Sequence, residues 1–246
     1  SGIMVILYLR KFKTVKLTKE KLRPHSHYIG RIVSLGMAPF FNQVSMMVVQ
    51  IVMNNVLIRY GAKSSYGSDI PLACAGIITK INMIFFAINT GISQGLQPII
   101  SYNYGARKLD RVREAYLKAA ISATIISTVS FICFQLFPRQ IIGIFGSESE
   151  AYFRFAEKFF RIFLFCTFIN GLQPITANFF TAIGKANRGI FLSLTRQVIF
   201  LLPLMIILPI FFGIEGVMFS APIADGFAAV CAITFAVKEL KSFQKL

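Results

Sequence analysis

Three ionisable side chains stand inside otherwise apolar stretches, and they are the residues best placed to do chemistry. They are Lys80, Arg196 and Asp225. A charge at the middle of a bilayer is costly unless it is paired or hydrated, so such residues face the interior of a helix bundle. Intramembrane charges of this kind serve ion or substrate pathways, or they hold helices together.

Arg196 and Asp225 lie at similar depths if their stretches are helices. With a rise of about 1.5 Å per residue, Arg196 is about 12 Å and Asp225 about 18 Å from the cytoplasmic ends of their helices. A long arginine side chain spans that difference, so we predict an ion pair that locks two helices together. The alternative is that Asp225 titrates or gates a pathway. Lys80 is about 10 Å from the outer end of its helix and is expected to snorkel outward.

Amides are the second polar class within the apolar stretches. Most of these amides, which include Asn89 and Asn170, are expected to form interhelical hydrogen bonds, their usual role in membrane bundles. Gln50 and Asn54 share a helix face at i and i+4 and are the best candidates to line a cavity. The predicted cavity-lining set is Gln50, Asn54, Asn82 and Asn178.

Metal binding and catalysis find little support. His25 and His27 form an HxH pair in a basic segment without cysteine or acidic neighbours, so no metal site or other cofactor is expected there. A membrane-embedded enzyme would need an HExxH motif or paired intramembrane acids, and the sequence has neither. The cysteines read as small core residues; they are Cys74, Cys133, Cys166 and Cys231.

The elements that position these residues follow from the spacing of charge. The chain has 246 residues, of which 55% are hydrophobic and 15% charged, whereas soluble domains are about 25% charged. The charges are clustered, and the stretches between them are long enough to cross hydrocarbon. Backbone groups in lipid must be satisfied within the segment, which selects helices. The sequence predicts an all-α bundle of six transmembrane helices within residues 32–237, over 32–58, 81–106, 119–138, 162–184, 197–214 and 216–237.

Basic residues set the predicted orientation. The segment 10–31 carries eight Lys or Arg against one acid, Glu20, and is predicted to be cytoplasmic. Of the later linkers, the one at 107–118 is strongly basic and the one at 59–69 is weakly basic. The linker at 139–161 has four basic residues balanced by three acids and is predicted to lie outside. Both ends of the bundle, including the tail 238–246, are therefore predicted to face the cytoplasm of a plasma (inner) membrane. The net charge of +16 is explained by these loops, and no nucleic-acid partner is expected.

Residues 1–9 are apolar but too short to span. Basic residues follow this run, whereas in a signal peptide they precede it. We expect the end of a truncated helix here, and an N-terminal part of the protein that precedes this sequence.

Prolines recur within the predicted spans. The pentapeptide Gly-Leu-Gln-Pro-Ile occurs twice, at residues 95–99 and 171–175. Proline removes a backbone hydrogen bond and permits a kink, so each copy is a candidate hinge. Chance similarity between apolar helices is an equal alternative.

Several motifs resemble those of one transporter family. The stretch Gly91-Ile-Ser-Gln-Gly-Leu-Gln-Pro-Ile-Ile-Ser-Tyr-Asn-Tyr-Gly-Ala-Arg-Lys, followed by Asp110 and Arg111, is similar to the hallmark after the second helix of the C-terminal lobe in multidrug and toxin extrusion proteins. The segments 181–186, 193–197 and 221–225 resemble later signatures of that lobe in the same order. The resemblance runs from about Tyr28 to Val237.

The resemblance implies twelve helices in two lobes and export of cationic, often aromatic, compounds in exchange for H⁺ or Na⁺. This chain would be the C-terminal lobe, with 10–31 as the bridge between lobes and the N-terminal lobe and membrane lipid as its partners. Some family members carry acidic residues on the first and fourth helices of this lobe, and both predicted spans here lack them. The coupling ion is therefore expected to bind mainly in the N-terminal lobe. The alternatives are a lipid-linked oligosaccharide flippase of the same superfamily and a membrane scaffold.

Overall fold

The computed structural model describes residues 26–145 and 149–243. The predicted truncated helix 1–9, most of the basic linker 10–31 with His25, the side chain of His27 and the last three residues of the tail lie outside this description. The chain divides into two compact units, residues 1–40 and 41–246. Contacts below are those within the second unit.

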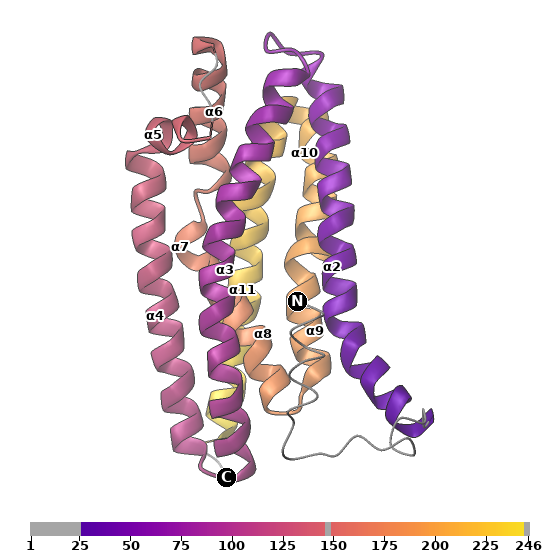
Figure 1. Ribbon diagram of the computed structural model, residues 1–246, viewed down its shortest axis with the longest axis vertical. Coiled ribbons are helices and arrows are strands. Elements are labelled where there is room, and N and C mark those ends of the chain that lie inside the picture. The colour runs from indigo at the N-terminus through magenta and orange to yellow at the C-terminus, as the bar shows by residue number, and fades with distance from the viewer. Residues whose placement is uncertain (1–25, 146–148, 244–246) are drawn as a thin grey trace, which may run out of the picture. The chain divides into compact units, whose positions relative to one another are not determined.

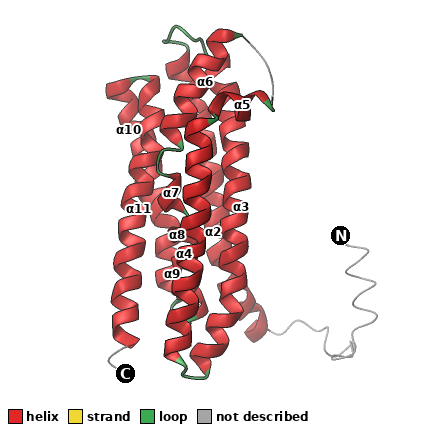
Figure 2. Ribbon diagram, turned by 90° about the vertical axis from the view of Figure 1, so that its left-hand side faces the viewer, coloured by secondary structure: helices red, strands yellow, loops and turns green. Residues whose placement is uncertain are grey.

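Every regular element in the described residues is a helix, which confirms the all-α prediction for this part of the chain (Figures 1 and 2). In chain order they are α2 Ser26–Gly61, α3 Asp69–Gly105, α4 Leu109–Leu136, α5 Pro138–Gly143, α6 Glu150–Phe163, α7 Thr167–Asn170, α8 Leu172–Ala182, α9 Ala186–Leu194, the π-helix η1 Thr195–Leu201, α10 Leu202–Phe212 and α11 Ile214–Phe243. Helix α2 begins at Ser26, inside the segment predicted as linker.

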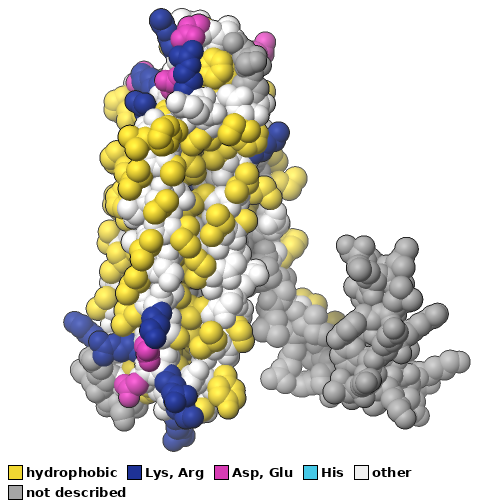
Figure 3. Space-filling view, turned by 60° about the vertical axis from the view of Figure 1, so that its left-hand side comes forward, with side chains coloured by type: hydrophobic (Ala, Val, Ile, Leu, Met, Phe, Trp, Pro, Cys, Tyr) yellow, Lys and Arg dark blue, Asp and Glu magenta, His cyan; other side chains and the backbone are white. Residues whose placement is uncertain are grey.

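Six membrane spans can be assigned within the described residues. Five helices are long and apolar enough to cross a bilayer, with α9, η1 and α10 counted as one, and a bent pair of segments makes the sixth. In Figure 3, hydrophobic side chains cover the middle of the visible face, while Lys, Arg and acidic side chains gather at its two ends. This distribution matches an apolar membrane flanked by water.

The fourth span differs from its prediction. It was expected as a charge-free helix over 162–184, but it runs from Glu150 to Ala182 and bends by 45° between α6 and the α7 and α8 segment. Helix α6 is amphipathic and presents charged residues outward. Its buried face is aromatic, comprising Tyr152, Phe155, Phe159, Phe160 and Phe163. A search for stretches without charge misses such a helix, because its apolar residues recur every three or four positions between charged ones.

The core of the second unit has two parts. The aromatic face of α6 packs with residues of α3 and α11, including Ile78 and Met218. A second cluster joins α3, α4, α8 and α11 through residues such as Ile100, Tyr116 and Phe179. Together they fix the helices that carry the intramembrane charges.

The two copies of Gly-Leu-Gln-Pro-Ile have different structures. The first lies within the unbroken helix α3, and a Cβ on Gly95 would meet nothing within 4 Å. The second begins at Gly171, where α7 ends and α8 starts. Only the second copy therefore coincides with an interruption of its helix.

Candidate functional site

The predicted contact between Arg196 and Asp225 is present. Arg196 Nε donates to Asp225 Oδ1 at 2.5 Å, and the two side chains are only 6% and 4% exposed. The contact joins η1 to α11, as expected for a pair that locks two helices. Because both charges are shielded from solvent, each depends on the other for its stability.

Two further side chains complete this charged cluster. Asn170, at the end of α7, donates from Nδ2 to Asp225 Oδ2 at 2.9 Å. The Arg196 guanidinium carbon lies 5.1 Å from the ring centroid of Phe86 on α3, a cation–π distance. Four elements thus converge on one ion pair, and both carboxylate oxygens accept a hydrogen bond. We call these four residues the charged cluster.

The backbone departs from regular α-helix around the charged cluster. Asn170 ends a four-residue helix, and Arg196 lies in the π-helix η1, where the N–H of Leu202 donates to the carbonyl five residues earlier, at Gln197. Pro222 stands three residues before Asp225 in α11. Irregular helix at membrane depth is tolerated where it is buried in protein, and π-helical turns occur frequently at functional sites.

The arrangement is suited to holding charge rather than to moving it. The carboxylate and guanidinium neutralise each other, and neither is open to a pathway through solvent. A substrate cation reaching Asp225 would have to displace both Arg196 and Asn170. The geometry therefore fits the structural role predicted for the pair better than that of a freely titrating acid.

A neutral polar cluster lies next to the same helix break. A Cβ built on Gly171 would be 2.5 Å from Ser127 Oγ and 2.6 Å from Asn89 Oδ1. Both side chains are fully buried, and neither oxygen has a hydrogen-bond partner. Further along the α3 and α8 contact, Ser93 Oγ donates to the carbonyl of Pro174 at 2.9 Å and accepts from Asn178 Nδ2 at 2.7 Å.

The predicted cavity-lining amides do not form one site. Gln50 donates to Asn54 across one turn at 3.2 Å, as their spacing predicted. Asn82 Oδ1 is buried without a partner, and Asn178 bonds to Ser93. Their cavity-lining role stays a prediction. Lys80 is exposed, and within the described part of the chain it has no ion pair.

Glu239 is a buried acid that the sequence reasoning missed. Its side chain is 3% exposed and pairs with Lys185 and with Arg188, the latter at 2.7 Å. The signal was its spacing: it continues the buried face of α11 that carries Asp225, Ala229, Ala232 and Ala236. The sequence does not make this buried position evident, because Glu239 lies between Lys238 and Lys241 near the C-terminus.

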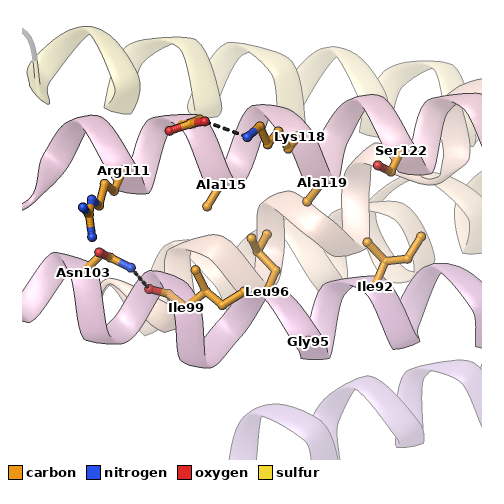
Figure 4. A pocket seen from close by; sticks show the side chains of 11 residues that line it. Ile92, Gly95, Leu96, Ile99, Asn103, Arg111, Ala115, Lys118, Ala119 and Ser122 are labelled. Carbon is orange, nitrogen blue, oxygen red and sulfur yellow. Dashed lines mark hydrogen bonds and ion pairs between the residues drawn. The ribbon is translucent and has the colours of Figure 1, made fainter.

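The described surface includes the following two hollows. The first, which we call the basic groove, has a volume of about 530 Å³ and runs between α3 and α4; its lining includes Gly95, Leu96, Ile99, Asn103, Arg111 and Lys118 (Figure 4). The second, of about 540 Å³, lies between α4, α6 and α11 and is mostly apolar. No group of three His, Cys, Asp or Glu residues in the described ranges could hold a metal ion.

Comparison with known proteins identifies relatives of this bundle. The multidrug export protein MepA of Staphylococcus aureus (strain bovine RF122 / ET3-1) is 24% identical over 234 residues, covering 95% of this chain and 50% of MepA. A solved structure described as the outward-facing conformation of a multidrug resistance MATE family transporter matches 99% of this chain and 54% of its own, with a TM-score of 0.84 and 19% identity. The inward-facing conformation of such a transporter matches with a TM-score of 0.79.

These relatives agree with the expected lobe architecture. The chain spans about half the length of the curated relatives it matches, as predicted for the C-terminal half of a two-lobe protein. The model of the MatE family matches residues 39–207, which include α3, α4, the bent fourth span and most of the fifth. On this evidence the chain belongs to the MatE family of membrane transporters.

Proposed function

We propose that this chain is the C-terminal lobe of a secondary active multidrug efflux transporter. Its substrates would be organic cations or other xenobiotics, exchanged for H⁺ or Na⁺ across the plasma membrane. The observation that carries this proposal is the MatE match over residues 39–207, together with relatives named for multidrug export that are about twice as long. Transporter sites generally lie at the interface of such repeats, so transport needs both lobes.

The charged cluster bears on where the coupling ion binds. Asp225 is the one carboxylate well inside a span of the described bundle, and it is held by Arg196 and Asn170. A carboxylate engaged in this way is a poor exchangeable ion site, because releasing it would leave Arg196 buried and unpaired. We place the coupling acid in the N-terminal lobe and give the charged cluster a supporting role.

A transport assay tests this proposal. The full-length protein would be expressed in a drug-hypersensitive strain, and efflux of a fluorescent organic cation would be followed in inverted vesicles under an imposed H⁺ or Na⁺ gradient. We expect gradient-driven efflux, and we expect Asp225→Asn to lower the amount of folded protein without changing its pH dependence per folded molecule. Efflux without dependence on either gradient would contradict secondary active transport.

The flippase alternative receives less support. The curated relatives are named for multidrug export, and the sequence contains no HExxH motif that would favour an enzymatic role. Loss of lipid-linked oligosaccharide translocation, with normal drug sensitivity, in a strain lacking the gene would favour the flippase instead.

A further inference from the structure

The basic groove combines an apolar floor with positive charge at one end. Figure 4 shows Leu96 and Ile99 of α3 facing Ala115 and Ala119 of α4, and Arg111 reaching from α4 toward Asn103 on α3. Gly95 leaves the floor open, since a Cβ there would meet nothing within 4 Å. The groove is thus shaped for a chain-like apolar group that ends in a polar head.

Its charge favours an anionic head. The segment at its basic end carries Arg107, Lys108, Arg111, Arg113 and Lys118, against Asp110 and Glu114. Glu114 also lines the groove, but it is engaged by Lys118 at 2.6 Å, and no acidic side chain in the described ranges forms an ion pair with Arg111. Arg111 therefore has N–H groups at the mouth of the groove that can meet phosphate oxygens.

The surface beside the groove is that of a lipid-facing helix. Helix α4 exposes a continuous aliphatic stripe made of Leu117, Ile121, Ile125, Val129, Ile132 and Leu136. These positions recur every three or four residues and so follow one face of the helix. The stripe carries no polar side chain, which suits contact with acyl chains rather than with an aqueous pathway.

We propose that the basic groove is a binding site for an anionic diacyl phospholipid. The phosphate lies against Arg111, beside Asn103, and one acyl chain follows Leu96 and Ile99 past Gly95. Basic pockets between transmembrane helices are known to bind anionic lipid head groups in this way. The orientation predicted from loop charge would draw the lipid from the cytoplasmic leaflet. The proposal is independent of the transported substrate.

Lipid binding to the purified full chain tests the charge requirement. Native mass spectrometry would compare phosphatidylglycerol with phosphatidylcholine of identical acyl chains. We expect tighter binding of phosphatidylglycerol, and Arg111→Gln should weaken it by about fivefold, the effect of losing one basic contact near an anionic lipid. Arg113→Gln is the matched control, since Arg113 is exposed on the same helix but does not line the groove.

A second pair of variants tests where the acyl chain lies. Gly95→Leu fills the groove and should reduce phosphatidylglycerol binding, whereas Gly76→Leu, equally open on the same helix but far from the groove, should leave it unchanged. Binding that is the same for both lipids, or that persists in both Arg111→Gln and Gly95→Leu, would overturn the proposal. So would equal losses in the groove variants and their controls, which would indicate general surface charge or helix damage.

Discussion

Asp225 and Arg196 place a full negative and a full positive charge among alanines and aromatic rings. Each of the two carboxylate oxygens has a donor, from Arg196 and from Asn170, and the guanidinium lies over Phe86. These charges are tolerated in the interior because each is paired and hydrogen-bonded within the cluster. Removing one member leaves another buried without its partner, which destabilises the fold.

A double-mutant cycle measures this dependence. Asp225→Asn or Arg196→Gln alone should lower the free energy of unfolding in detergent by about 3 to 5 kcal/mol, because each leaves a buried charge unpaired. The double variant should recover much of that loss, giving a coupling energy of a few kcal/mol. Additive losses would contradict the ion pair, since contacting charges in a low-dielectric interior interact strongly.

Gly171 is a second position where one atom decides stability. Gly171→Ala would place a Cβ within 2.6 Å of Ser127 Oγ and Asn89 Oδ1, and such overpacking costs about 1 to 3 kcal/mol. The same change at Gly95, in the matching pentapeptide, meets nothing and should be tolerated. Thermal unfolding of the two variants provides the comparison.

Ser127→Ala refines this prediction. Because Ser127 Oγ has no partner, its removal should cost little by itself. In the Gly171→Ala background it should restore part of the lost stability. If Gly171→Ala and Gly95→Ala were equally stable, close packing at the helix break would not be the reason for glycine there.

The sequence predicted the residues of the ion pair but not that Asn170 and Phe86 join them. Arg196 and Asp225 stand out because charges are rare in spans, and their depths follow from counting residues. Asn170 is one of the amides expected to form interhelical hydrogen bonds, but its partner depends on the break after Phe163. Phe86 lies on the unbroken helix α3, and its contact depends on the π-helix that places Arg196. Neither irregularity has a distinctive composition.

At the level of helices, α11 contacts the rest of the bundle through one face of small residues. A buried acid stands on each side of these residues in the sequence, Asp225 before them and Glu239 after them. Ala228, Ala229, Ala232 and Ala236 let neighbouring helices approach closely. Glu239 then accepts from Lys185 and Arg188 in the α8 and α9 region. The contact fastens the end of α11 to the beginning of the fifth span.

Removing the ion pairs of Glu239 should lower the free energy of unfolding. Glu239→Ala leaves two cations without their shared partner and should lower stability by about 2 to 3 kcal/mol, less than for a fully buried pair because both cations reach solvent. Glu114→Ala removes an exposed i, i+4 pair with Lys118 and should change stability little, because such surface pairs are screened by water. Unfolding curves of the two variants, measured together, compare their free energies of unfolding. Equal losses would show that the burial of Glu239 does not increase the contribution of its ion pairs to stability.

The element that sequence reasoning placed least well was the fourth span. The spacing of charge predicts its uncharged second half but assigns α6 to an outer linker, because α6 contains Arg154, Glu157, Lys158 and Arg161. Those side chains face outward while five aromatic rings face the core. The spacing of charge also locates α3 and α4, but these helices begin 12 and 10 residues before the predicted stretches 81–106 and 119–138, because charged residues occupy their N-terminal parts.

For the whole molecule, half of a two-lobe transporter should be unable to transport. We expect the 246-residue chain, reconstituted alone in liposomes, not to move an organic cation under an imposed H⁺ or Na⁺ gradient, because the cavity requires two lobes. The full-length protein is the positive control. Gradient-driven movement by the chain alone would show that one lobe is sufficient.

The orientation of the bundle gives a further test. The turn between α3 and α4 is strongly basic and the turn between α2 and α3 is not, so the first is predicted to be cytoplasmic. In a cysteine-free background, Lys108→Cys should be protected in intact cells from a membrane-impermeant maleimide, and Ser65→Cys should react. The reverse pattern would invert the assigned topology.

The π-helix η1 also affects how this protein is compared with its relatives. A π-helical turn accommodates one residue more than the α-helical turn it replaces, and each residue turns the helix by about 100°. A relative with a regular α-helix in this span should therefore align with a one-residue gap between Thr195 and Leu201. Without that gap, every residue of α10 would be matched to a neighbour on the wrong face, and lipid-facing positions would be mistaken for core positions.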